Sequence, residues 1–179
     1  MNTEHLLPNL YCRDIASVPF QRLAEQGIVN ICIDLDNTLA LRHSDLIEQH
    51  IIEALNKARQ AGFINKICVV SNIVFGKKRF NRVKFAAQQL QTPYFFAAHL
   101  FNRKPLAAPF LKAMEMMGST AENTAMIGDQ IFTDIVGGNR LGLYTVLVVP
   151  LGGDHWVTGF TGRRRREKRL LKDLVMHHQ

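Results

Sequence analysis

The sequence predicts a three-layer α/β fold in which helices cover both faces of one parallel sheet. Short apolar runs alternate five times with segments whose apolar residues recur at helical spacing. This alternation is typical of consecutive strand-helix units in a parallel sheet. The 179 residues are 47% hydrophobic and 21% charged, which is the composition of an ordinary soluble domain with one buried core.

Each expected element has a local signal. Gly27 and Gly62 directly follow segments with helical spacing, where glycine commonly ends a helix. Pro109 is tolerated only in a first turn, so its helix should begin between residues 105 and 108. Residues 1–18 show no period, and we expect an irregular arm there. The expected strands are residues 28–34, 66–70, 94–97, 124–127 and 144–149, and the expected helices are residues 19–26, 47–60, 77–90, 105–117 and 131–141.

Charge and hydropathy favour a cytoplasmic protein that is at most peripheral to a membrane. No apolar stretch approaches the roughly 20 residues that span a bilayer, and the first residues lack the basic-then-apolar layout of a secretory leader. Seven basic and two acidic residues lie between Arg163 and Asp173, so this segment carries most of the net charge of +7. We therefore expect one domain over residues 1–160 and a basic amphipathic C-terminal helix over residues 161–179.

Polar side chains follow several of the expected strands. Asp34 and Asp36 come after the first, and Ser71-Asn72 after the second. Lys104 lies shortly beyond the third, and Asp129 follows the fourth. Because the carboxyl ends of parallel strands open on one edge of the sheet, these residues should converge there.

The converging groups suit phosphoryl transfer. One Asp carboxylate can attack phosphorus to form an aspartyl-phosphate, and a second carboxyl can donate a proton to the leaving oxygen and later activate water. Carboxylate oxygens favour Mg²⁺, which would cancel the repulsion between nucleophile and phosphate. Donors that could hold the phosphoryl oxygens are Thr38, Ser71, Asn72 and Lys104, and Asp129 could supply a further metal ligand.

Four motifs in this order resemble the haloacid dehalogenase (HAD) superfamily of phosphatases, and more narrowly its YqeG-like branch, related to phosphatidylglycerophosphate phosphatases. The motifs are Asp34-Leu35-Asp36-Asn37-Thr38, Ser71-Asn72, Lys104-Pro105 and Gly128-Asp129-Gln130 with Thr133-Asp134. The resemblance implies a Rossmann-like, HAD-type fold with a five-stranded parallel sheet. It also implies Asp34 as nucleophile, Asp36 as general acid and base with its carbonyl on Mg²⁺, Thr38, Ser71 and Asn72 as phosphate-binding residues, Lys104 as the cation that orients Asp34, Asp129 as a direct metal ligand, and Asp134 as one acting through water.

The spacing between motifs leaves no room for a cap domain. Residues 39–70 and 73–103 are each used up by one helix and one strand with short loops. The resemblance then points to the minimal-cap subclass, type IIIA, with an open site. Such a site suits a bulky substrate, or it can be closed by a neighbouring subunit.

Three functions remain open. We favour a lipid phosphate such as phosphatidylglycerophosphate, because a basic amphipathic tail suits an anionic membrane surface. A second hypothesis is a phosphatase of a soluble sugar phosphate or nucleotide. A third is a non-catalytic module that binds RNA or a protein. No motif is broken, which disfavours the non-catalytic module. The tail lacks interleaved aromatic residues and the body is nearly neutral, which disfavours nucleic acid.

Overall fold

Six parallel strands form one sheet, with the order β1-β6-β5-β2-β3-β4. The computed structural model describes residues 3–74 and 76–152, so the expected C-terminal helix lies outside the described residues. The strands are β1 (Leu10–Cys12), β2 (Asn30–Ile33), β3 (Lys66–Asn72), β4 (Tyr94–Ala98), β5 (Thr124–Gly128) and β6 (Tyr144–Val148). The helices are α1 (Phe20–Glu25), α2 (Gln49–Gln60), α3 (Lys77–Gln89), α4 (Ala107–Met117) and α5 (Val136–Asn139), with a π-helix over Ile131–Ile135 and short 3₁₀ turns at Thr3–Leu6, Ile15–Ser17, Leu100–Asn102 and Ala121–Asn123.

The expectation of five strands and an irregular arm over residues 1–18 was wrong, because this segment contains β1. Leu10 pairs with Val146 in β6, and the Asn9 side chain accepts a hydrogen bond from the backbone N–H of Thr145 (2.8 Å). A three-residue strand is too short to display a period of two, so the sequence pattern could not reveal it.

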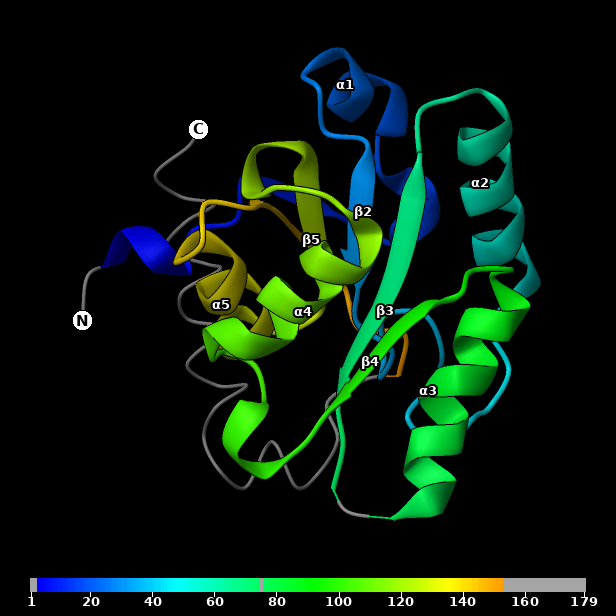
Figure 1. The fold of residues 1–179 in the computed structure, drawn as a ribbon. Helices are drawn as coiled ribbons and strands as arrows, with labels where there is room; N and C mark the ends of the chain where they lie inside the picture. The colour runs from blue at the N-terminus through cyan, green and yellow to red at the C-terminus, as the bar shows by residue number, and fades with distance from the viewer. Residues whose placement is uncertain (1–2, 75, 153–179) are drawn as a thin grey trace.

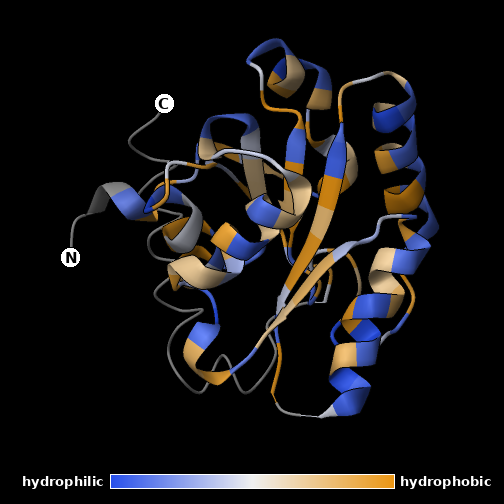
Figure 2. Ribbon diagram, in the orientation of Figure 1, coloured by the Kyte–Doolittle hydropathy of each residue, from blue (hydrophilic) through white to orange (hydrophobic). Residues whose placement is uncertain are grey.

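The helices lie in two layers, as expected. Figure 1 shows α2 and α3 on one side of the sheet and α4 and α5 on the other. Successive strand residues face opposite layers: Ile31 and Ile33 pack with α2, whereas Cys32 packs with α4. Figure 2 shows the same pattern in hydropathy, with apolar strands between helices that carry polar outer faces.

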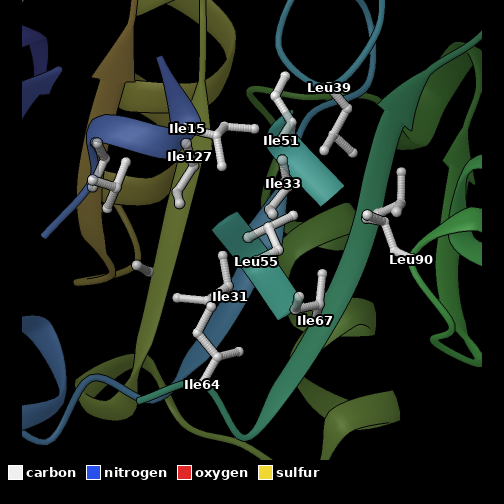
Figure 3. Packing of buried hydrophobic residues seen from close by; sticks show 14 of the residues in the cluster. Ile15, Ile31, Ile33, Leu39, Ile51, Leu55, Ile64, Ile67, Leu90 and Ile127 are labelled. Atoms are coloured by element: carbon white, nitrogen blue, oxygen red, sulfur yellow. The ribbon is translucent and has the colours of Figure 1, made fainter. Parts of the chain in front are cut away.

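The larger core lies beneath α2 and α3 (Figure 3). Ile51 and Leu55 of α2 sit above Ile33 and Ile67 of the sheet, and all four are at most 1% exposed. At roughly 1.5–3 kcal/mol for each fully buried Leu or Ile side chain, this contact is a main source of the attachment of α2 to the sheet.

Most element boundaries match the sequence within two residues. Helix α4 begins at Ala107 and ends at Gly118, whose left-handed φ of 61° suits a residue without a Cβ. The segment 131–141 differs, because its first turn is a π-helix. Such wide turns are frequent at functional sites.

The carboxyl edge of the sheet is open, as the motif spacing predicts. Between Thr38 and Ser71 the chain forms α2 and most of β3, and between Asn72 and Lys104 it forms α3, β4 and a short turn. No cap domain is present in these described segments. Among the described residues, no helix has both the length and the apolar character needed to cross a bilayer.

Candidate active site

Asp34 and Asp129 are brought together by two adjacent strands. Asp34 directly follows β2 and Asp129 directly follows β5, and Ile33 pairs with Ile127 across these strands. The backbone N–H of Asp34 donates to the carbonyl of Ile127 (2.9 Å), which extends the ladder to the first carboxylate. Asp134 joins them from the π-helix, and oxygen atoms of the three carboxylates lie within 4.8 Å of one another.

Lys104 enters this cluster from the loop between β4 and α4. Its Nζ lies 2.6 Å from Asp34 Oδ1 and 2.7 Å from Asp134 Oδ1, and it also donates to the carbonyl of Val70 (2.8 Å). The residue is 2% exposed. A buried ammonium with three oxygen neighbours has little freedom, so Lys104 fixes the orientation of Asp34.

Asn72 holds the backbone of Lys104. Its Oδ1 accepts from the Lys104 N–H (2.8 Å), and its Nδ2 donates to the Lys104 carbonyl (3.0 Å). The sequence assigned Asn72 to the phosphate, and the structure gives its amide this positioning contact. The two hydrogen bonds connect the end of β3 to the loop before α4, which carries Lys104 to Asp34.

The cluster has more negative than positive charge. Burial raises the pKa of the Asp34 carboxyl well above its usual range. The Lys104 ammonium opposes this shift, whereas the nearby Asp134, Asp129 and Asp36 carboxylates add to it. Burial lowers the pKa of Lys104, but Asp134 and Asp34 outweigh it and hold the pKa above its usual value. Lys104 therefore stays charged, and the surplus carboxylates need a further cation.

A magnesium ion fits these residues. Asp34 Oδ2 is buried, and no described residue hydrogen-bonds to it, so this oxygen is available to a ligand. The donors are all carboxylate oxygens, which suit Mg²⁺ better than zinc or copper. Asp34, Asp129 and Asp134 would hold the ion, either directly or through water.

Gly128 makes room for Asp134. A Cβ at position 128 would collide with the Asp134 carboxyl group. The second oxygen of that group, Oδ2, accepts from the backbone N–H of Gln130 (3.2 Å). Any side chain at position 128 would therefore displace Asp134 from the cluster.

Asp36 lies apart from the three carboxylates and faces α3. Its Oδ1 forms an ion pair with Arg82 (2.5 Å), and both side chains are 14% exposed. Arg82 also donates to the carbonyls of Leu41 and Ser44. The turn after Asp36 is tight, with Asn37 at a left-handed φ of 61°, a conformation that asparagine tolerates better than most residues. Arg82 thus ties this turn and the Asp36 carboxylate to α3.

A pocket of about 230 Å³ opens over these groups. Five of the residues singled out from the sequence line it, whereas Thr38, Asp129 and Asp134 do not. Thr38 is buried, and its Oγ has no hydrogen-bond partner among the described residues. Sequence reasoning missed Arg42, Arg82 and Arg103. Arg82 lies in a helix with an expected basic face, but nothing in the spacing singled it out. The lining consists of Asp34, Asp36, Arg42, Ser71, Asn72, Ile73, Val74, Arg103, Lys104, Pro105, Gln130 and Thr133.

A larger hollow of about 570 Å³ lies along the outer side of α3. It is lined by Asp45, Lys77, Lys78, Asn81, Arg82 and Phe85. It contains no group of carboxylates comparable to the cluster at Asp34, and we therefore place the chemistry in the smaller pocket.

Comparison with known proteins supplies the context for this geometry. Residues 1–150 match the mitochondrial PGP phosphatase family. A probable phosphatase of Bacillus subtilis (strain 168), YqeG, is 33% identical over 175 residues, covering 97% of this chain and 94% of that protein. Phosphatidylglycerophosphate phosphatase 1 of Arabidopsis thaliana, chloroplastic/mitochondrial, is 28% identical over 169 residues, which are 94% of this chain but 48% of that protein. A solved structure from Listeria monocytogenes serotype 4b, of an uncharacterized protein, has a TM-score of 0.56 at 18% identity over 72% of this chain and 84% of that one, which supports the fold alone.

Proposed function

Since the chain belongs to the mitochondrial PGP phosphatase family and is therefore a phosphatase, we propose that it hydrolyses phosphatidylglycerophosphate through an aspartyl-phosphate on Asp34. The observation that carries the mechanism is the meeting of Asp34, Lys104, Asp129 and Asp134 at the open edge of the sheet. A nucleophile, a fixed cation and a set of metal ligands are the parts that this reaction needs.

The first step forms a bond between Asp34 and phosphorus while the bond from phosphorus to the ester oxygen breaks. Lys104 holds the attacking Asp34 carboxylate in place through Oδ1. Asp36 gives a proton to the leaving alcohol, for which its carboxyl must turn from Arg82 toward the pocket. Bound Mg²⁺ would supply positive charge to the phosphoryl oxygens and the nucleophile.

The second step releases phosphate. Asp36 takes a proton from a water molecule, which attacks phosphorus and breaks the bond to Asp34. Ser71 and Thr38 offer hydroxyl donors for phosphoryl oxygens, and the unpaired Thr38 Oγ is consistent with such a role. Asn72 acts by positioning Lys104.

The lipid substrate is supported by the pocket mouth as well as by the family. Val74 lines the pocket and is 71% exposed, and Phe101, two residues before Arg103, is 89% exposed. Exposed apolar side chains beside cations suit the interface of an anionic membrane. We propose peripheral contact of this edge, and of the basic tail, with such a surface. A sugar phosphate or nucleotide is the alternative substrate.

The nucleophile is tested with Asp34→Asn. We expect phosphate release with Mg²⁺ to fall by at least about 10³-fold, because the amide is a poor nucleophile. The matched control is Asp14→Asn, whose side chain caps a 3₁₀ turn outside the pocket, a role that Asn retains. Turnover by Asp34→Asn at the rate of the control would refute the assignment.

The substrate and the metal are tested with a panel at fixed Mg²⁺. Phosphatidylglycerophosphate in mixed micelles is compared with glycerol 3-phosphate, a hexose phosphate and a nucleoside monophosphate. We expect the highest kcat/KM for the lipid, and loss of activity in EDTA that Mg²⁺ restores. A higher kcat/KM for a soluble compound would overturn the lipid assignment, and no Mg²⁺-dependent turnover at all would favour a binding module.

A further inference from the structure

We propose that a basic pocket beside the catalytic one binds a second phosphate of the substrate, a phosphodiester. This inference rests on the proposed function, because it assumes that the phosphomonoester lies at Asp34. The ligand class is a compound that carries both a phosphomonoester and a phosphodiester a few bonds apart, either as a lipid head group or as its soluble deacylated form.

The two pockets share one lining residue, Arg42. The second has a volume of about 220 Å³ and is lined by Arg42, His43, Asp45, Lys78, Arg79 and Arg82. Arg42 also lines the catalytic pocket, together with Asp34 and Ser71. Arg42 can therefore contact a ligand in either pocket, and the proposal places one ligand across both. At about 30 Å³ per water molecule, the second pocket has room for roughly seven waters, which is ample for a phosphate group.

The cations in this pocket have few counter-ions. Four of its lining side chains are Lys or Arg, and Asp45 is the one acid among them. Arg82 is already engaged, because it pairs with Asp36 and donates to the carbonyls of Leu41 and Ser44. In the described part of the chain, the side chains of Arg42, Lys78 and Arg79 make no hydrogen bond or ion pair. These three charges are available to an anion.

The arrangement has an energetic cost in the free protein. Lys78 and Arg79 lie in the first turn of α3, which contains no acidic residue, and cations are unfavourable at that end of a helix. Arg42 adds a third positive charge in the second pocket. An anion bound there removes the repulsion, and guanidinium groups match the geometry of phosphate oxygens.

On this proposal, a phosphomonoester alone leaves the cations of the second pocket without an anion. Lys104 lies between Asp34 and Asp134, and Lys78 and Arg79 line the second pocket but not the catalytic one. Only a ligand with a second anionic group engages both sets. We therefore expect the enzyme to prefer compounds with two phosphates over those with one.

The test uses substrates that differ in the phosphodiester. The double variant Lys78→Gln/Arg79→Gln is compared with wild type on deacylated glycerophospho-glycerophosphate, on phosphatidylglycerophosphate in mixed micelles, and on glycerol 3-phosphate. We expect the ratio of kcat/KM for either diester-containing substrate to that for glycerol 3-phosphate to fall by about tenfold or more. The ratio is independent of the fraction of folded enzyme. Lys84→Gln, an exposed position of α3 that lines neither pocket, should leave the ratio unchanged.

An unchanged ratio for both diester-containing substrates would overturn the inference. A fall for the micellar lipid alone would also overturn it, since the cations would then contact the lipid surface rather than the head group. Binding of glycerophosphoglycerol, which has the diester and no monoester, is followed by NMR and needs no turnover. Weaker binding to the double variant than to wild type would support the pocket even if no phosphomonoester were hydrolysed. Failure of the proposed function can therefore be told apart from failure of this inference.

Discussion

Replacing Lys104 by Met removes the ammonium and keeps a side chain of similar length. The buried carboxylates of Asp34 and Asp134 then lose the cation that lies 2.6 and 2.7 Å from them. Removing one partner of a buried ion pair costs roughly 3–5 kcal/mol, because it leaves an uncompensated charge. For a domain of this size we expect a decrease in Tm of roughly 6–20 °C.

The cost should depend on pH. Burial raises the pKa of Asp34 in the folded protein, and Lys104 opposes that shift. Without Lys104 the folded carboxyl holds its proton to a higher pH, whereas the unfolded one loses it near its ordinary pKa. The folded state thus binds more protons, and its stability falls as pH rises through this interval. The difference in unfolding free energy between variant and wild type should be larger at pH 8 than at pH 5.

Urea unfolding in EDTA at these two pH values measures the effect. The control is Lys112→Met, an exposed lysine of α4 that pairs with Glu115, where we expect a change of at most about 0.5 kcal/mol. If Lys104→Met were as stable as this control, or equally destabilised at both pH values, the charge argument for the cluster would be refuted.

Two further substitutions test the supporting contacts. Gly128→Ala would place a Cβ against the Asp134 carboxyl group. We expect the Mg²⁺ affinity, measured by metal titration of the activity, to fall by about 10–100-fold. An affinity equal to that of the wild type would refute the role of Asp134. Arg82→Met releases Asp36 and two loop carbonyls from α3. We expect a loss of about 1–3 kcal/mol in stability, and a lower kcat with little change in KM for glycerol 3-phosphate. A rise in KM by the same factor as the fall in kcat would show that Arg82 acts in binding.

The fold could be predicted largely because its central strands are fully buried. In β2 and β5 every residue is buried, and after one polar residue at its start, Asn30 or Thr124, each appears in the sequence as a short apolar run between helical patterns. β1 escaped prediction because its three residues are too few to show a period, and they range from exposed Tyr11 to buried Cys12. Its position at the edge depends on pairing with β6 and on the Asn9 side chain, contacts between residues more than 130 positions apart.

The candidate site could be predicted as far as strand ends specify it. Asp34 and Asp129 come directly after β2 and β5, and because these strands are adjacent and parallel, the two side chains lie close together at the same edge of the sheet. The partner of Asp36 could not be predicted, since Arg82 meets it only when α3 packs on the sheet. Asn72 likewise contacts Lys104 across a distance in sequence that no local pattern encodes.

β2 has hydrogen-bonded neighbours on both sides, β3 and β5, so Asp34, the proposed nucleophile, is attached to the part of a fold that opens last in thermal fluctuations. The cations of the second pocket sit instead on a loop and on the first turn of α3, where exposed substitutions usually change stability by about 0.5 kcal/mol or less. If the second pocket selects among phosphorylated compounds as proposed, that selectivity can be redesigned at a few outer positions without disturbing the carboxylate cluster.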